Sequence, residues 1–250
     1  MKACSKSVRL DQLLVDRAEY SSREKAKRAV MAGCVEVGGR LVDKPGTGVP
    51  VGADVRVLRR SEPFVSRAGR KLDAALDRFC LDPTDAICID IGASTGGFTD
   101  CLLQRGAKRV YAVDVGRGQL DFALYKDSRV VVMDRVNARY LDADAFPEEP
   151  RLITVDVSFI SLLKVVPALL PLLAPGADLV TLIKPQFEAP RGALAKGGIL
   201  RDEALREQVV DERSRQIAEL GLDLLGLMES PVAGRGGNRE ALAHFRRGAP

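Results

Sequence analysis

The sequence predicts an α/β protein in two parts: a small α+β module followed by a doubly wound α/β domain. Short apolar strands alternate regularly with helical segments from residue 86 to residue 228, which is typical of a parallel sheet covered on both faces. The first 58 residues instead combine two amphipathic helices with short strands. The expected boundaries are 1–60 for the module, 61–66 for a linker and 67–250 for the larger domain.

Charge divides the chain in the same place. Residues 1–70 hold 15 Lys and Arg against 8 Asp and Glu, whereas residues 71–250 hold 23 against 26. A basic module attached to a mildly acidic body indicates a nucleic-acid-binding part, although a solvated basic face is the alternative.

Composition and cysteine use restrict the class of protein. The chain is 46% hydrophobic and 29% charged, as in ordinary globular domains, and no apolar run reaches the ~18 residues of a membrane span. The residues after Met1 lack the pattern of a signal peptide, and five cysteines without a Cys-x-x-Cys pair favour reduced thiols in a cytoplasm. No metal site is expected, and the single histidine, His244, is expected to be a satisfied residue on the last strand.

The basic module has a predictable order of elements. Apolar residues at helical spacing predict a helix over 9–18, and Ser21 or Ser22 is expected to cap a second helix that Gly33 ends. Lysines and arginines occupy the outer face of that second helix, where they can contact phosphates. The expected strands are 35–37, 41–42 and 55–58, with a Gly38-Gly39 turn after the first.

The pattern RLDQLL…SSREKAKRAVMAGCVEVGGRLVDKPGTGVPVGADVRV, within residues 8–58, resembles the RNA-binding domain first described in ribosomal small-subunit protein four. The resemblance implies binding to folded RNA, chiefly through phosphates and shape. The candidate RNA-binding residues are Arg9, Arg23, Lys25, Lys27, Arg28 and, at the start of the larger domain, Arg67.

The larger domain is expected to bind its ligand where its strands end. Parallel sheets of this class carry ligands at the carboxyl ends of their strands. The expected strands are 86–90, 110–114, 130–133, 152–157, 177–183 and 222–228, and the expected helices are 97–105, 119–125, 162–173 and 202–220.

The segment from Asp90 to Thr99 has the character of a cofactor loop. Its spacing, Gly92-x-x-x-Gly96-Gly97, differs from the Gly-x-Gly-x-x-Gly of dinucleotide sites. Asp90 would repel a pyrophosphate but could hold the amino group and sulfonium side of S-adenosyl-L-methionine, and Asp114 suits the two ribose hydroxyls of a nucleoside. S-adenosylmethionine is therefore favoured over a dinucleotide or no cofactor.

Four charged residues follow strands or open a helix at the same edge of the predicted sheet: Lys71, Asp156, Lys184 and Glu240. They are expected to converge in one crevice, although each alone could be a surface charge beyond a strand end. The set resembles the Lys-Asp-Lys-Glu tetrad of FtsJ-type RNA ribose 2′-O-methyltransferases. With the RNA-binding module, the whole chain is similar to the TlyA (haemolysin A-like) family.

This resemblance implies a Rossmann-like methyltransferase that methylates ribose 2′-hydroxyls in ribosomal RNA, with cytidine as the target in the small subunit, the large subunit or both. The partners it implies are ribosomal RNA or ribosomal subunits, without a membrane, and it sets no oligomeric state. The cofactor contacts it implies are Asp90, Gly92, Ser94, Thr95, Gly96, Gly97, Phe98, Thr99 and Asp114, with Asp134 and Asn137 beside the adenine.

The residue types suit such a transfer. Lys184 is the expected base, with Lys71 lowering its pKa, Asp156 orienting it and Glu240 holding Lys71 or the ribose. The alternative is that Lys184 only positions the hydroxyl and solvent takes the proton. The loop 186–201, which carries Arg191, Lys196 and Arg201, is expected to close over the RNA.

Two functions of other classes fit the sequence less well. A non-catalytic RNA-binding or ribosome-assembly factor would show decay of the tetrad or of the cofactor loop, and the sequence shows neither. A pore-forming cytolysin would need an apolar span, a long amphipathic helix or barrel strands. The sequence shows no clear pattern of any of these.

Overall fold

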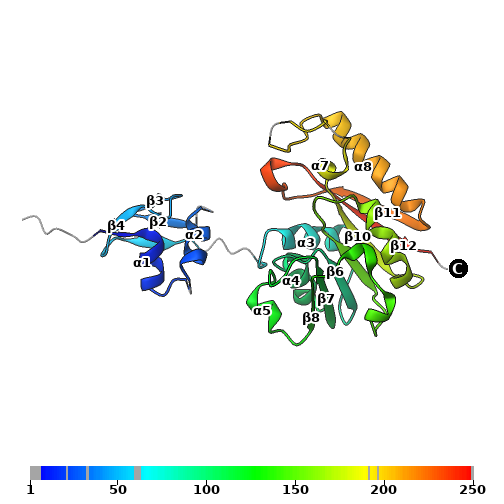
Figure 1. Cartoon of the computed structure of the whole chain (residues 1–250), viewed down its shortest axis with the longest axis horizontal. Coiled ribbons are helices and arrows are strands. Elements are labelled where there is room, and N and C mark those ends of the chain that lie inside the picture. Colours follow the sequence, from blue (N-terminus) through cyan, green and yellow to red (C-terminus); the bar gives the residue numbers. More distant parts are fainter. Residues whose placement is uncertain are drawn as a thin grey trace, which may run out of the picture. The chain divides into compact units, whose positions relative to one another are not determined.

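The computed structural model describes residues 7–20, 22–31, 34–58, 63–190, 192–195 and 197–248, and the side chains of Arg28 and Arg235 lie outside this description. The chain separates into two compact units, Met1–Glu62 and Pro63–Pro250 (Figure 1).

The first unit is a small α+β fold around one apolar core. Helices α1 (Leu10–Asp16) and α2 (Arg23–Met31) pack with a three-stranded antiparallel sheet ordered β3-β2-β5 and a two-stranded pair β1-β4. Its core is Leu10, Leu13, Leu14, Ala26, Val30, Val35 and Val49. The strands are β1 (Ser7–Arg9), β2 (Val35–Val37), β3 (Arg40–Leu41), β4 (Gly48–Pro50) and β5 (Val55–Val57).

Both predicted helices of this unit are present, with shifted ends. Helix α1 ends at Asp16 rather than at residue 18, because Ala18 adopts a left-handed backbone with φ 58°. The Oγ of Ser22 accepts the backbone N–H of Lys25 at 3.3 Å, as a capping residue does. Ser21 and Gly33 lie outside the described residues. The pair β1-β4 was not predicted, because three-residue strands carry little periodicity.

The second unit is built on a seven-stranded sheet ordered β11-β12-β10-β9-β6-β7-β8. The expected parallel pairing is confirmed for the five strands from β10 to β8, but β12 runs antiparallel to both of its neighbours. The connection from β11 to β12 consists only of residues 230–240, and so short a connection favours an antiparallel pair, because a parallel pair needs a longer crossover. The strands are β6 (Ile87–Ile91), β7 (Arg109–Asp114), β8 (Val130–Asp134), β9 (Leu152–Val155), β10 (Asp178–Ile183), β11 (Leu222–Glu229) and β12 (Ala241–Arg247).

Helices cover both faces of this sheet, which confirms the doubly wound class (Figure 1). Alternate residues of each strand face opposite layers: Ile89 packs with α6 and α8, whereas Cys88 packs with α3 and α4. The helices are α3 (Ala68–Arg78), α4 (Gly97–Gln104), α5 (Phe122–Tyr125), α6 (Val166–Leu169), α7 (Pro185–Glu188) and α8 (Glu203–Ala218). Short 3₁₀ turns occur at Ala138–Tyr140, Ala143–Ala145, Leu162–Lys164, Leu170–Leu172 and Arg235–Gly237.

Three predicted boundaries need correction. The continuous helix expected over 162–173 is broken into α6 and two 3₁₀ turns, because Pro167 and Pro171 cannot donate within a helix. The helix expected over 119–125 is only α5, capped by Asp121, whose carboxylate accepts the N–H of Ala123 at 2.9 Å.

The third correction concerns the linker. Phe64, 7% exposed, packs in the core of the second unit, and the N–H of Val65 donates to Asp100 Oδ2 at 2.8 Å. Residues 63–66 therefore belong to the second unit, while 59–62 lie outside the described residues.

Candidate active site

Glycines in the loop after β6 allow its backbone to approach neighbouring segments of the chain closely. Gly92 has φ 84°, and a Cβ there would lie 2.4 Å from the carbonyl oxygen of Asp156. Gly96, with φ 94°, is the N-cap of α4, and a Cβ at Gly97 would lie 2.3 Å from Ser66 Oγ. Only glycine fits these positions, so the loop is held close to the end of β9 and to the start of α3.

A cavity of about 650 Å³ lies at the carboxyl ends of β6, β7 and β9. Asp114 stands in its wall with a fixed carboxylate, because Oδ2 accepts the N–H of Ser94 at 2.8 Å and Oδ1 accepts that of Gly116 at 2.7 Å. Of the predicted cofactor residues, Gly92, Ser94, Asp114 and Asn137 line this cavity. Apolar walls that the sequence analysis missed come from Val113, Val115, Val136, Val157, Ile160 and Val165.

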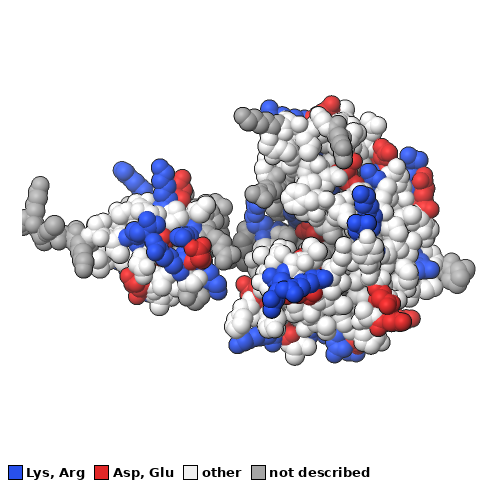
Figure 2. Space-filling view, in the orientation of Figure 1, with Lys and Arg blue, Asp and Glu red and all other residues white. Residues whose placement is uncertain are grey.

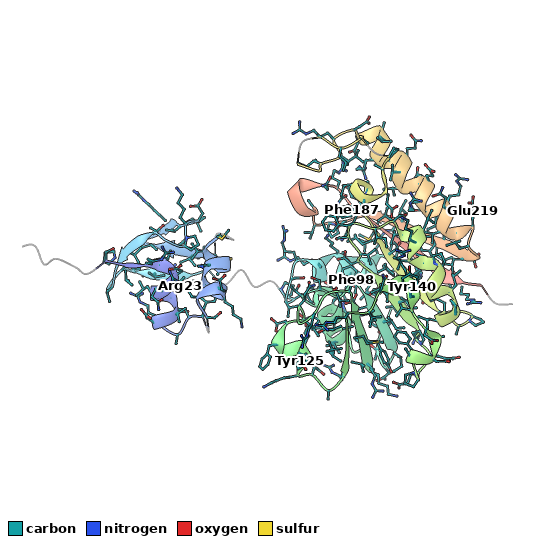
Figure 3. All side chains as sticks on the ribbon, viewed as in Figure 1. Arg23, Phe98, Tyr125, Tyr140, Phe187 and Glu219 are labelled. Atoms are coloured by element: carbon teal, nitrogen blue, oxygen red, sulfur yellow. The ribbon has the colours of Figure 1, made fainter. Side chains whose placement is uncertain are left out.

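A second cavity, of about 220 Å³, connects the loop to the predicted catalytic residues. Predicted loop residues line one side of it, and Asp156, Ser158 and Lys184 line the other. Ser158, which the sequence analysis did not select, also lines the larger cavity. The loop residues are Gly92, Ser94, Thr95, Gly97 and Phe98, of which Phe98 is labelled in Figure 3.

Four predicted cofactor residues line neither cavity: Asp90, Gly96, Thr99 and Asp134. Asp90 is fully buried, and its carboxylate accepts the hydroxyls of Thr99 at 2.7 Å and Thr154 at 3.1 Å. Burial raises the pKa of Asp90 to about 7. Asp134 Oδ2 accepts the N–H of Gly118 at 2.8 Å. The side chains of Asp90, Thr99 and Asp134 therefore hold the loops together, and contact of these four residues with a cofactor stays a prediction.

The four predicted catalytic residues do converge, as two ion pairs. Lys184 Nζ lies 2.5 Å from Asp156 Oδ1 and donates to Ser158 Oγ at 2.8 Å. Lys71 Nζ lies 2.5 Å from Glu240 Oε2. Lys71, Lys184 and Glu240 are buried, at 7%, 9% and 2% exposed. Each lysine therefore has its own carboxylate partner, so the expected crowding of one lysine by the other is not the main feature of the site.

A third cavity, of about 310 Å³, lies beyond Lys184. Lys71, Lys184 and Glu240 line it, together with Gln186 and the predicted RNA-binding residue Arg67. Ser158 lines all three cavities, so the three cavities are neighbours. Two aromatic rings stand in the wall of the third cavity, 4.8 Å apart: Phe159, which is 84% exposed with φ 64°, and Phe187 (labelled in Figure 3).

Two of the predicted RNA-binding residues of the first unit, Arg9 and Arg23, contact the same carboxylate. Asp11 is fully buried and accepts two hydrogen bonds from Arg9, at 2.9 and 3.1 Å, and one from Arg23 Nε at 3.2 Å. The side chains of Arg9 and Arg23 remain 52% and 46% exposed. Lys27 pairs with Glu24 at 2.6 Å, Lys25 is exposed, and Arg28 lies outside the described side chains. Figure 2 shows Lys and Arg side chains gathered on the face of this unit that it presents.

Comparison with known proteins agrees with both units. Residues 8–55 match the S4 domain family, and residues 64–247 match the FtsJ-like methyltransferase family. The chain belongs to the FtsJ-like methyltransferase family. The match covers most of the second unit, including all four tetrad positions.

Relatives match this FtsJ-like methyltransferase over nearly its whole length. A 16S/23S rRNA (cytidine-2′-O)-methyltransferase, TlyA of Mycobacterium tuberculosis, is 42% identical over 97% of this chain and 91% of its own. Hemolysin A of Brachyspira hyodysenteriae is 44% identical over 95% of this chain and 99% of its own. A solved structure of a provisionally named hemolysin of Streptococcus thermophilus has a TM-score of 0.77 at 42% identity, covering 98% of this chain and 90% of that one.

Two further features bear on the sequence predictions for this FtsJ-like methyltransferase. Asn238 anchors the loop after α7, because Oδ1 accepts the N–H of Leu200 and Nδ2 donates to the carbonyl of Gly198, both at 3.0 Å. Arg191 and Lys196 lie outside the described residues, and closure of the loop stays a prediction. In the part of the chain that the structure describes, no helix is long and apolar enough to cross a membrane.

Proposed function

We propose that this protein transfers a methyl group from S-adenosylmethionine to ribose 2′-hydroxyls of ribosomal RNA, with cytidine as the target nucleoside. The observation that carries the proposal is the position of Lys184. Its side chain lines both the cavity next to the glycine loop and the cavity beyond it, paired with Asp156. A group in that position can meet both a methyl donor on one side and an acceptor oxygen on the other.

The residues of the largest cavity fit the cofactor. Its volume, about 650 Å³, is within the range of small-molecule sites. Asp114 keeps unused acceptor positions for ribose hydroxyls, and Val136 and Ile160 offer apolar walls to an adenine. Ser94 and Gly92 line both this cavity and the next, where the methionine part would extend. When bound, S-adenosylmethionine supplies an electrophilic methyl group on its sulfonium.

The tetrad supplies positioning and a route for the proton. Asp156 and Ser158 hold the ammonium of Lys184 where it can contact the 2′-oxygen, so the oxygen is aligned with the methyl group. The proton of the 2′-hydroxyl passes to Lys184 Nζ where Lys184 has first given up its own proton and is a neutral amine, or passes to solvent where Lys184 stays an ammonium; both routes place Nζ at that oxygen. Lys71, held by Glu240, offers a cation in the cavity that would receive the nucleotide and its phosphate.

The first unit supports RNA as the acceptor. Its resemblance to S4 domains, its arginines held by Asp11 and the name of the TlyA relative all indicate ribosomal RNA. Ribosomal subunits lacking the modification are therefore the first substrates to test, with free rRNA beside them.

The experiment is transfer of labelled methyl groups from S-adenosylmethionine to such subunits. Wild type is compared with Lys184→Ala and with Lys164→Ala, a matched control in which an exposed lysine is removed. We expect label on ribose 2′-oxygens of cytidine with wild type and the control, and a loss of about a thousandfold or more with Lys184→Ala. Absence of label with a wild type that binds cofactor and RNA would indicate a ribosome-assembly factor instead.

A further inference from the structure

Gln186 has a buried side-chain amide of which one end, the nitrogen, is hydrogen-bonded (the occupied end) and the other, the oxygen, is not (the unoccupied end). It lies in the first turn of α7, just beyond Lys184, and is 7% exposed. Its Nε2 donates to Glu240 Oε1 at 3.1 Å, whereas its Oε1 is buried without a hydrogen-bond partner among the described residues. The reverse orientation of the amide would place two oxygens together, so the contact with Glu240 decides which end is unoccupied.

The occupied end holds the carboxylate of the tetrad. Glu240 is 2% exposed; its Oε2 accepts the ammonium of Lys71 at 2.5 Å, and its Oε1 accepts the amide of Gln186. The backbone of Gly234 lies against the same Oε1, since a Cβ there would come within 2.0 Å of it. Gln186 thus links the segment that carries Lys184 to the carboxylate that holds Lys71.

The unoccupied end points to a ligand that donates a hydrogen bond. A buried acceptor without a partner is destabilising, and native structures retain few such groups, so each one requires an explanation such as a role in the site. Gln186 lines the third cavity, which the proposed function assigns to the target nucleotide. In the sugar–phosphate backbone of RNA, the donors are the 2′-hydroxyls.

We propose that Gln186 is a fifth functional residue of the site: its amide N–H positions Glu240, and its carbonyl oxygen accepts a hydrogen bond from a ribose hydroxyl of the substrate. This inference rests on the proposed function. It predicts that both ends of the amide matter, and that a side chain of the same size without polar atoms cannot replace it.

The test compares three variants of the full chain. Gln186→Met keeps the volume and removes both polar ends, and Gln186→Glu keeps an acceptor and loses the donor while it is ionised. Gln216→Met is the matched control, because Gln216 also donates to a glutamate at 3.1 Å, Glu212, but lies on α8 outside the cavities. Turnover of labelled methyl, RNA affinity and S-adenosylmethionine affinity are measured for each between about pH 5 and 9.

We expect Gln186→Met to lower turnover by about ten- to a hundredfold at every pH, with the affinity for S-adenosylmethionine unchanged. Gln186→Glu should regain activity relative to wild type as the pH falls, because a proton shared with Glu240 restores the missing donor. The other charged groups lining this cavity are Lys71, Lys184 and Arg67. A role in packing alone would produce no such recovery.

Three results would overturn the inference. One is wild-type turnover in Gln186→Met. The second is an equal fall of cofactor affinity and turnover in that variant, which would make Gln186 a packing residue. The third is a flat pH ratio for Gln186→Glu. A wild type that transfers no methyl group, by contrast, removes the proposed function itself and this inference with it.

Discussion

Two aspartates, one in each unit, are fully buried yet are held by different partners. Asp11 of the first unit accepts hydrogen bonds from the guanidinium groups of Arg9 and Arg23, and the bond from Arg9 lowers its pKa to about 2. Asp90 of the second unit accepts the hydroxyls of Thr99 and Thr154, and burial raises its pKa to about 7. Burial alone therefore does not decide the charge of a carboxylate; its partners do.

The difference matches what each unit has to do. A charged Asp11 holds two arginines that remain about half exposed, so the first unit presents two cations in a fixed arrangement. Asp90 is kept from solvent and ties the first turn of α4 to β9, so the cofactor loop and the strand before Asp156 are joined by short hydrogen bonds. Asp11 thus fixes two cations at the surface of the first unit, whereas Asp90 holds the glycine loop to the sheet of the second unit.

The largest effect is expected from Asp90→Leu. The substitution leaves the buried hydroxyl of Thr99 without its acceptor and leaves that of Thr154 with only the carbonyl of Ile89 at 3.4 Å, so the free energy of unfolding should fall by at least about 1–3 kcal/mol. Chemical denaturation measures this, with Asp223→Leu at an exposed position of β11 as the control. A loss no larger than that of the control would mean that Asp90 does not brace the loop.

Asp11→Asn is expected to act on RNA recognition instead. The substitution removes a negative charge but releases Arg9 and Arg23, so the affinity for substrate RNA should fall about tenfold while the affinity for heparin does not fall. Asp16→Asn, exposed at the end of the same helix, is the control. If Asp11 acts through the arginines, its effect should shrink when both are alanine; additive effects would contradict this.

The sequence predicted the order of elements and the charged residues of the site, because both follow from local patterns. Apolar alternation located the strands, and Lys71, Asp156, Lys184 and Glu240 stand at strand or helix ends that the topology brings together. The contacts of Lys184 with Asp156 and of Lys71 with Glu240 were also among the expectations, although the sequence left open whether Glu240 holds Lys71 or the ribose. Lys184 and Asp156 follow the ends of the neighbouring parallel strands β10 and β9, whereas Lys71 reaches Glu240 from helix α3, a contact that only the fold shows.

What the sequence missed depends on contacts between distant segments. The contact of Asp90 with a cofactor stays a prediction, but its hydrogen bonds to Thr99 of α4 and Thr154 of β9 could not be predicted from its place before Gly92. Ser158 and Gln186 each lie close in sequence to a predicted catalytic residue, but only the fold shows that they line the cavities. Nothing in the sequence marked Asp11, and only the structure shows that it contacts two arginines.

The two aspartates should give opposite pH dependence of stability. The pKa of Asp11 is below its ordinary value of 3.8, so its contribution to the first unit is present above about pH 4 and is lost as the pH falls toward 2. The pKa of Asp90 is raised, so the folded second unit holds a proton that the unfolded chain has released, and its stability should decline as the pH rises from about 4 to about 7. Unfolding measured across pH tests both, and Asp90→Asn should remove the second slope. A slope that persists in Asp90→Asn would assign it to another group.

The smallest effect is expected from two substitutions of Arg23, which test whether RNA binding depends on the number of positive charges in the first unit or on their placement. Arg23→Ala should lower the slope of log affinity against log salt by about one, as expected for one lost phosphate contact. Arg23→Lys should keep that slope, because the charge remains, but lower the preference for substrate RNA over heparin. A lysine that contacts Asp11 has no second rigid N–H group to offer a phosphate, whereas the arginine bonds Asp11 through Nε alone. If the lysine variant keeps both the slope and the preference, charge alone accounts for RNA binding, and the arrangement around Asp11 serves only stability.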